Sequence, residues 1–244
     1  MTKLTPAQRV IVAADFKVSD GQSISSIENE VLMLAGQLSG TGVCLKFNSI
    51  LRACGYHLIQ KICDYGLDVF ADLKLNDIPN TLQCDGTLLR EYKPKFLSVM
   101  CPAGIKAIRG LKDELPDTRL LGVTVLTSLD DATTIPMFGG PVKEVVPRFA
   151  EIGKAGGVDG LVCSPAEVTE LRQRHGDRLL LVTPGIRPSW APVPKDDQNQ
   201  ERVMTPVEAI QSGADYLVVG RPIIGATDRR TATMRIIEEI AAAA

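Results

Sequence analysis

The feature of this chain that most constrains its fold is a series of short aliphatic runs separated by longer amphipathic stretches. Each run is continuously apolar instead of alternating, which is typical of strands buried on both faces, as in a parallel sheet. We predict eight such strands: Arg9–Phe16, Gly42–Phe47, Asp68–Leu75, Phe96–Met100, Leu120–Leu126, Gly160–Ser164, Leu179–Gly185 and Tyr216–Gly220.

Helical stretches lie between these runs. The alternation of strand and helix favours parallel strands joined by right-handed helical crossovers. The clearest predicted helices are Ile24–Leu38, Ile50–Tyr65, Thr81–Tyr92, Val142–Ala155, Pro165–Arg174, Pro206–Ser212 and Thr231–Ala242.

Two α/β architectures can hold eight such units, namely a closed barrel and an open, doubly wound sheet. The chain has 244 residues, close to the about 250 that are typical of one barrel. The G-x-G-x-x-G turn that favours a dinucleotide site is missing after the first strand, where AADFKVSDG stands instead. We therefore predict an α/β fold in which residues 1–244 form a single (β/α)8 TIM barrel, with its active site at the C-terminal ends of the strands.

The composition favours a globular chain that acts on small molecules. Apolar residues make up 45% and charged residues 23%, which is enough aliphatic material for a substantial core. The net charge of −2 offers no basic field for a phosphate backbone, so we expect no nucleic-acid partner. No apolar run approaches the ~20 residues that span a bilayer, and MTKLTPAQRV lacks the core of a signal peptide, so we expect no membrane association and a cytoplasmic location.

The cysteines are scattered, without a C-x-x-C pair, and mostly lie in apolar segments, as reduced core cysteines do. We therefore expect neither disulfides nor a zinc site.

The third predicted strand ends in charged residues, because Asp72, Lys74 and Asp77 all lie within DVFADLKLNDIPNT. Period-two alternation places Asp72 and Lys74 on one face and the neighbouring leucines on the other, toward the helices. Buried charges are rare unless they are paired, so these two groups either form a structural ion pair or serve a functional site.

Two neighbouring strands favour the functional interpretation. Asp15 closes the first predicted strand and Lys46 closes the second, so the first three strands supply acid, base, acid and base at one rim. Taken singly, each of these residues would more often be a solvated strand end. Together they predict a network that holds one lysine protonated and able to deliver a proton to developing negative charge, and Lys74 is our candidate for that donor.

The last two strands are each followed by a glycine and an arginine. LVTPGIRP places Gly185 and Arg187 after strand seven, and LVVGRPI places Gly220 and Arg221 after strand eight. TIM barrels frequently bind phosphate at these two positions with backbone N–H groups. A turn glycine followed by a surface arginine is the ordinary alternative, but two such turns on these strands favour a phosphorylated substrate.

The segment after strand seven, Pro188–Met204, is the longest polar stretch and contains the only tryptophan, Trp190. A long loop at a catalytic rim often closes over the ligand as a lid. A passive insertion would have a similar composition, but the position directly after GIRP favours the lid.

At DLKLNDIPNT the sequence resembles the D-x-K-x-x-D-I-P-N-T signature of the orotidine 5′-monophosphate decarboxylase family. VAADF, LKF, GVTVLTS, TPGIRP and YLVVGRPI resemble further segments of that family in the same order, so the similarity covers nearly the whole chain. The resemblance implies a cofactor-free and metal-free barrel that decarboxylates orotidine 5′-monophosphate to UMP and CO₂, the last step of de novo pyrimidine nucleotide synthesis.

The resemblance also implies roles for the charged residues. Asp15 would bind the ribose, and Lys46 would contact the ribose and join the charge network. Asp72 would lie near the substrate carboxylate and Lys74 would protonate C6. Asp77, together with Thr81, would reach into the site of a neighbouring subunit, which implies a homodimer.

The resemblance also implies contacts for the pyrimidine and the phosphate. Thr127, with Ser128 beside it, would contact the pyrimidine. Arg187, Gly220 and Arg221 would hold the phosphate.

The family also carries a lid glutamine that bridges base and phosphate. In DDQNQERVMTP the register counted back from Met204 selects Gln200, whereas the preceding acidic pair selects Gln198, and we favour Gln200. KFNS after the second strand departs from the family's usual lysine followed by Val-Gly, which affects the local backbone but leaves Lys46 in place.

Two other functions share parts of this pattern. A Mg²⁺-dependent sugar-phosphate decarboxylase or aldolase of the same suprafamily also has D-x-K-x-x-D, but the DIPNT extension, the GIRP turn and the lid glutamine favour the nucleotide. A noncatalytic nucleotide-binding barrel would be expected to lose a charged member, and none is missing here.

Overall fold

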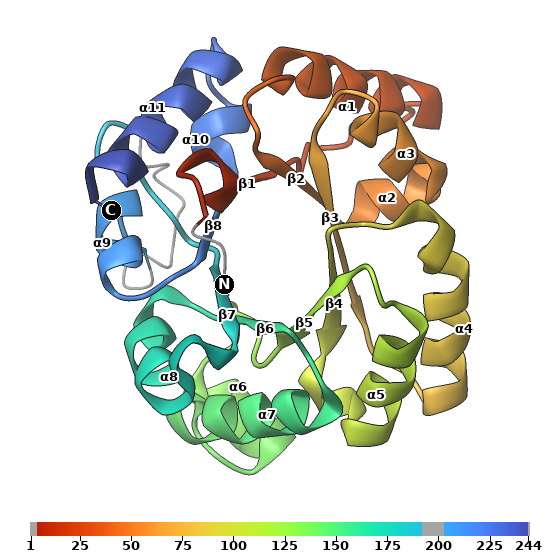
Figure 1. The fold of residues 1–244 in the computed structure, drawn as a ribbon, viewed down its shortest axis with the longest axis vertical. Coiled ribbons are helices and arrows are strands. Elements are labelled where there is room, and N and C mark those ends of the chain that lie inside the picture. Colours follow the sequence, from red (N-terminus) through yellow and green to blue (C-terminus); the bar gives the residue numbers. More distant parts are fainter. Residues whose placement is uncertain (1–3, 192–202, 244) are drawn as a thin grey trace.

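The computed structural model describes residues 4–191 and 203–243, and it shows a closed barrel of parallel strands. Figure 1 looks along the barrel, with the strands as an inner ring and the helices around them. The strands are β1 (Val10–Ala13), β2 (Cys44–Phe47), β3 (Asp68–Leu75), β4 (Phe96–Met100), β5 (Arg119–Val123), β6 (Gly160–Val162), β7 (Leu180–Thr183) and β8 (Tyr216–Val219).

Each strand pairs with the strands that precede and follow it in the chain. The ring is closed by β1 and β8, which pair in parallel with Ile11 opposite Val218. This closure confirms the predicted (β/α)8 barrel and excludes the open sheet. Five strands, β1, β5, β6, β7 and β8, end one to three residues earlier than predicted, because the last residues of those apolar runs already belong to the loops above the barrel.

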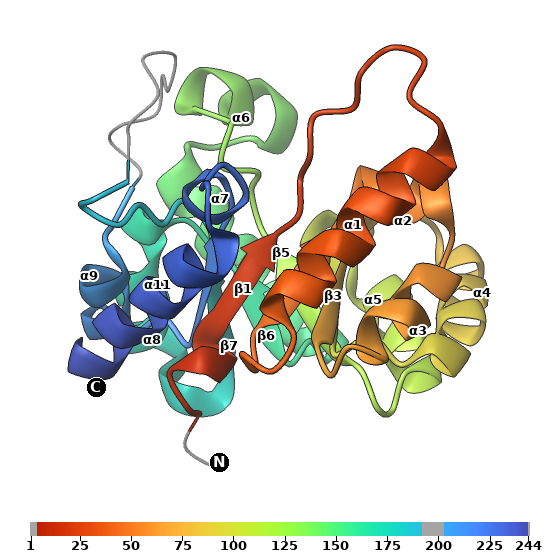
Figure 2. The ribbon, with the colours of Figure 1, turned by 90° about the horizontal axis from the view of Figure 1, so that it is seen from above.

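The helices form the outer layer. They are α1 (Ile24–Leu38), α2 (Ser49–Cys54), α3 (His57–Cys63), α4 (Pro79–Leu89), α5 (Ile105–Glu114), α6 (Asp131–Phe138), α7 (Val142–Gly156), α8 (Val168–His175), α9 (Pro206–Gln211), α10 (Arg221–Ile224) and α11 (Arg229–Ala243). In Figure 2, α6 and the segment between β1 and α1 project beyond the barrel on the side toward which β1 points.

The prediction of one continuous helix over Ile50–Tyr65 was wrong. The structure has two helices there, α2 and α3, which are separated at Gly55. Gly55 has φ of +88°, a conformation that a helix interior does not accept and that glycine adopts without steric cost. Three helices lie outside the predicted set: α5, between β4 and β5, α6, between β5 and β6, and the short α10 directly after β8.

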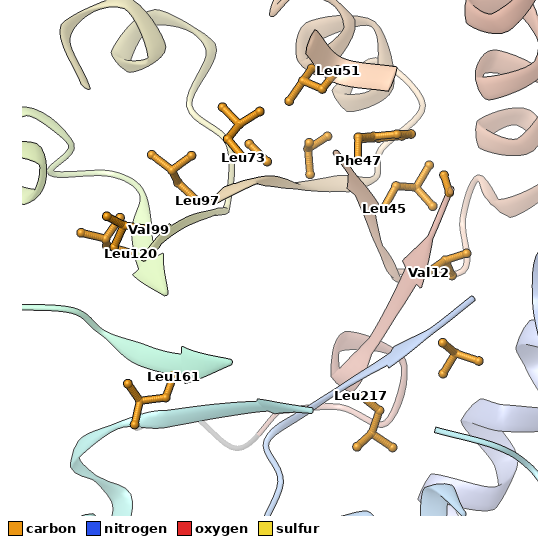
Figure 3. Packing of buried hydrophobic residues seen from close by; sticks show 14 of the residues in the cluster. Val12, Leu45, Phe47, Leu51, Leu73, Leu97, Val99, Leu120, Leu161 and Leu217 are labelled. Atoms are coloured by element: carbon orange, nitrogen blue, oxygen red, sulfur yellow. The ribbon is translucent and has the colours of Figure 1, made fainter. Parts of the chain in front are cut away.

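Two apolar layers hold the barrel together. Outward-facing residues such as Val12, Leu45, Leu97 and Leu217 pack beneath the helices, as Figure 3 shows. Inward-facing residues fill the barrel itself, where the rings of Phe96 and Tyr216 meet edge to face with centroids 5.0 Å apart. This inner plug leaves the C-terminal ends of the strands as the place where a cavity can open.

All six cysteines lie within the described residues and are free thiols, four of them buried. Within the same residues, every helix is too short or too polar to cross a membrane.

Candidate active site

A cavity of about 480 Å³ opens at the C-terminal ends of the strands. Its floor is apolar and includes Phe70, Val123, Val162 and Val218 from four different strands. Polar residues line its walls, so a ligand would meet an apolar base and charged sides. That combination is typical of small-molecule sites, in which a few polar groups fix the orientation of the ligand.

Lys46 lies at the centre of the charged wall. Its side chain leaves the end of β2 and is almost fully buried, with 7% of the residue exposed. The Nζ atom donates to both carboxylate oxygens of Asp15, at 3.2 and 3.0 Å, and to Oδ2 of Asp72 at 3.2 Å. The ammonium is therefore compensated by two carboxylates, as a buried charge requires.

Asp72 is the carboxylate that links the two lysines. Its Oδ2 accepts from Lys74 Nζ at 2.6 Å as well as from Lys46, and its Oδ1 accepts from the hydroxyl of Ser98 at 2.7 Å. Burial by itself would raise the pKa of Asp72, but the two ammonium groups and these hydrogen bonds hold that pKa below its ordinary value. The group is therefore ionised before any substrate arrives.

The end of β3 departs from a regular strand. Ala71 pairs with Leu97 of β4 and Leu75 pairs with Val99, so three residues of β3 lie opposite Ser98 alone. Lys74, within this bulge, has φ of +48°, the left-handed region that non-glycine residues seldom adopt. Strict alternation, as expected from the sequence, therefore stops after Leu73, although Asp72 and Lys74 still line the same cavity.

Ser98 is the site residue that the sequence analysis missed. It is completely buried, and its hydroxyl accepts from the backbone N–H of Lys74 at 2.9 Å while it donates to Asp72. A signal was present, since Ser98 is the only polar residue in FLSVM and lies two positions after the inward-facing Phe96. Period-two alternation would have placed it beside the charged end of β3.

The C-terminal ends of β7 and β8 carry the glycines and arginines, and we call this part of the lining the arginine wall. Arg187, Gly220 and Arg221 line the cavity, and Gly185 lines it beside Arg187 with φ of +81°. The backbone after Gly185 is held in place because Arg187 N–H donates to the carbonyl of Met204 at 2.8 Å. The structure thus brings two guanidinium groups and two glycine-containing loops to the same cavity as the lysine network.

The other predicted site residues lie partly within and partly outside the lining of the cavity. Thr127 lines the cavity, whereas Ser128 beside it is exposed and outside the lining. Asp77 and Thr81 also lie outside the lining, and Asp77 Oδ1 accepts from the N–H of Ile78 at 2.7 Å. Gln198 and Gln200 lie outside the described residues.

The beginning of the predicted lid is attached to the last helix. The ring of Trp190 lies 4.5 Å from the guanidinium carbon of Arg235, and its Nε1 donates to Glu239. Both partners belong to α11. The loop therefore starts from a fixed point beside the arginine wall.

Fold and site together define a class, a (β/α)8-barrel protein with a prebuilt carboxylate–lysine network facing an arginine- and glycine-lined wall. The family model described as "Orotidine 5'-phosphate decarboxylase / HUMPS family" matches residues 8–236. The chain belongs to this family.

Individual relatives agree with this assignment. An orotidine 5′-phosphate decarboxylase of Heliobacterium modesticaldum is 38% identical, with 96% of both chains covered. One from Syntrophotalea carbinolica is also 38% identical and covers 92% of this chain and 93% of its own. Among solved structures, the orotidine 5′-phosphate decarboxylase of Lactobacillus acidophilus matches with a TM-score of 0.78 and 32% identity, covering 96% of this chain and 99% of that one.

Proposed function

We propose that this chain is an enzyme that converts orotidine 5′-monophosphate to UMP and CO₂, as the names of its relatives indicate. The observation that carries the proposal is the ionised Asp72 held between Lys46 and Lys74 on one wall of the cavity. The reaction is the last step of de novo pyrimidine nucleotide synthesis.

The chemistry follows from that arrangement. The bond between C6 and the carboxylate carbon breaks, CO₂ leaves, and the electron pair stays on C6. The ammonium of Lys74, 2.6 Å from Asp72, stabilises this charge and then transfers a proton to C6. The negative charge of Asp72 positions that ammonium and opposes the substrate carboxylate, which is lost on the way to the transition state.

The rest of the substrate fits the remaining polar residues. Asp15 and Lys46 hold the ribose, and Thr127 with Ser128 contacts the pyrimidine. The phosphate binds at the arginine wall, where its contacts are Arg187, Gly220 and Arg221. The glycine turns there offer backbone N–H groups, and the guanidinium groups make charge-assisted hydrogen bonds. Closure of the segment Pro188–Met204, through Gln200 or Gln198, completes the site.

The proposal includes a homodimer. Asp77 and Thr81 lie outside the cavity of their own chain, at the start of α4. Between them in the chain, Ile78 exposes 65% of its surface and would be covered by such a subunit contact. In this assembly Asp77 and Thr81 would reach the neighbouring site, and residues 1–244 would form one cytoplasmic domain that needs no cofactor.

The alternative is a Mg²⁺-dependent sugar-phosphate decarboxylase or aldolase. A divalent cation at this wall would need open carboxylate oxygens. Both oxygens of Asp72 already accept hydrogen bonds, Oδ2 from two ammonium groups and Oδ1 from Ser98. The donor set at Asp72 therefore favours the metal-free reaction.

The test is to follow the absorbance of orotidine 5′-monophosphate with purified protein in EDTA. We expect wild type to form UMP, and Lys74→Ala to lose at least ~10³-fold in kcat. Lys95→Ala is the matched control, because Lys95 pairs with Asp68 at 2.5 Å but lies outside the cavity lining. Folded wild type that makes no UMP, or makes it only with added Mg²⁺, would refute the proposal in favour of the alternative.

A further inference from the structure

The peptide unit between Leu73 and Lys74 lies at the point where β3 leaves the barrel ladder. The regular pairing with β4 stops at Ala71 and resumes at Leu75, so the polar groups between them have lost their usual strand partners. The backbone of Lys74 is also left-handed, with φ of +48°. Such a conformation persists only where the surroundings fix it.

Two side chains supply the hydrogen bonds that the strand pairing does not provide at this peptide unit. The N–H of Lys74 donates to Oγ of Ser98 at 2.9 Å. The carbonyl of Leu73, at the other end of the same peptide unit, accepts from Nη2 of Arg52. One peptide plane is therefore held from two directions by residues of β4 and α2.

Each of these side chains is itself oriented. Ser98 is completely buried and donates its single hydroxyl proton to Oδ1 of Asp72 at 2.7 Å, which leaves its lone pairs for Lys74. Arg52 donates through Nη1 to Oδ1 of Asn48 at 2.7 Å, which fixes the guanidinium above β3. The peptide unit is thus clamped by prearranged groups.

The geometry points to Ser98 and Arg52 as positioning residues for the decarboxylation, because they clamp the Leu73–Lys74 peptide and so aim the Lys74 ammonium at Asp72 and the cavity. This inference rests on the proposed function of Lys74. Neither residue lines the cavity, so neither touches the substrate. Their effect reaches C6 through the backbone of Lys74 and, for Ser98, through the carboxylate of Asp72.

The first test compares Ser98→Ala and Arg52→Met with wild type. We expect kcat to fall about 10- to 100-fold in the first and about 10-fold in the second, because small misplacements of a catalytic group are costly. KM should change far less, because the arginine wall is untouched. Ser98→Thr, which keeps the hydroxyl, and Arg52→Lys, which keeps a donor, should recover part of the loss.

Matched controls separate positioning from general stability. Thr233→Val removes a fully buried hydroxyl that donates to Arg229 O at 2.7 Å, and Arg109→Met removes an exposed guanidinium that donates to Ala155 O at 2.6 Å. Both should keep the wild-type kcat, even where Thr233→Val lowers the melting temperature as much as Ser98→Ala does. A wild-type kcat in both clamp variants would overturn the inference, as would equal losses in the controls.

The pH profile gives a readout that a purely structural role would not move. The hydrogen bond from Ser98 is one of the influences that lower the pKa of Asp72, alongside Lys46 and Lys74, while Asp15 faces the group across Lys46. Ser98→Ala should therefore shift the acidic limb of kcat/KM to higher pH. Arg52→Met, which does not contact the carboxylate, should leave that limb in place, and the opposite pattern would contradict the clamp.

Crystal structures of the variants make the inference independent of the reaction. With either contact removed, we expect Lys74 to leave the left-handed region and its Nζ to move from Asp72. An unchanged Lys74 backbone in both variants would overturn the clamp, even with an active enzyme. If wild type made no UMP, the proposed function would fail, and the same structures would still show whether the clamp exists.

Discussion

The two walls of the cavity are built in different ways. On the wall formed by β1 to β3, Lys46 and Asp72 are 7% and 6% exposed, and every charged group has a partner from the same wall. On the arginine wall, Arg221 is exposed and Arg187 is half-buried, and each follows a glycine by one or two residues. One wall is a buried ionic network, and the other consists of more exposed arginines next to glycine-containing loops.

The difference indicates that the first wall is positioned before the substrate binds, whereas the second wall serves to bind it. Burying charges costs free energy, which folding must supply, so the network is fixed before the substrate arrives and can act on the transition state at once. The guanidinium groups of the arginine wall lie nearer to solvent, and in the proposed function they contact the phosphate only when the substrate binds. Variants of the first wall should therefore affect turnover and stability, and variants of the second should affect binding of the phosphate.

The largest expected effect comes from breaking the network at Asp72. Asp72→Asn removes the charge that aims both lysines, and kcat should fall at least ~10³-fold. Rapid-quench single-turnover measurement of UMP formation would separate this loss from product release. Asp68→Asn is the matched control, since Asp68 lies on the same strand and pairs with Lys95 at 2.5 Å. A similar loss of kcat in both variants would mean that the Asp72 network matters no more for turnover than an ion pair at the other end of β3.

The same substitution should also cost stability in a pH-dependent way. The folded pKa of Asp72 lies below its ordinary value of 3.8, so its ionised form stabilises the fold above that pH and the contribution disappears as pH falls through the folded pKa. At pH 7 we expect Asp72→Asn to lose about 3 kcal/mol of unfolding free energy, because Lys46 keeps only Asp15. Urea unfolding from pH 7 to pH 3 should show the gap between the two proteins narrowing below pH ~4. A gap that stays constant would mean that the network contributes no ionic stabilisation.

On the other wall, Arg221→Met should act through the phosphate alone. Loss of one charge-assisted hydrogen bond should lower kcat/KM for orotidine 5′-monophosphate about 10- to 100-fold. The unphosphorylated nucleoside orotidine is the control substrate, and its slow decarboxylation should be the same in variant and wild type. Equal losses on both substrates would place Arg221 in the chemistry instead of the phosphate site and would break the comparison.

Much of the fold could be predicted because its signals are local. Continuous apolar runs marked every strand of the barrel, and β3 and β4 agree with the predicted bounds. The charged wall was also visible in the sequence, since Asp15, Lys46 and Asp72 each follow an apolar run whose end must face the rim. The contacts among these residues then follow from the order of adjacent strands in a parallel barrel.

The remainder depends on contacts between distant segments. The bulge in β3, the left-handed Lys74 and the contact of Arg52 with Leu73 O all arise where α2, β3 and β4 meet above the barrel. Periodicity carries no information about a local change of register, because that change is set by the neighbouring strand. Ser98 differs from these features, because its place in FLSVM already pointed it into the barrel; what the sequence did not show is that it lies opposite the irregular end of β3 and binds Asp72 and Lys74 there.

The smallest expected effect provides the sharpest contrast between the walls. Because Arg221 is exposed, Arg221→Met should change the unfolding free energy of the ligand-free protein by less than ~0.5 kcal/mol. Saturating UMP should raise the melting temperature of wild type by mass action, and this rise should shrink in the variant because its affinity for the phosphate is lower. Uridine should stabilise both proteins equally, which serves as the internal control. If the ligand-free variant were as destabilised as Asp72→Asn, the arginine wall would also be part of the folded framework, and the division between a prebuilt network and a ligand-organised wall would fail.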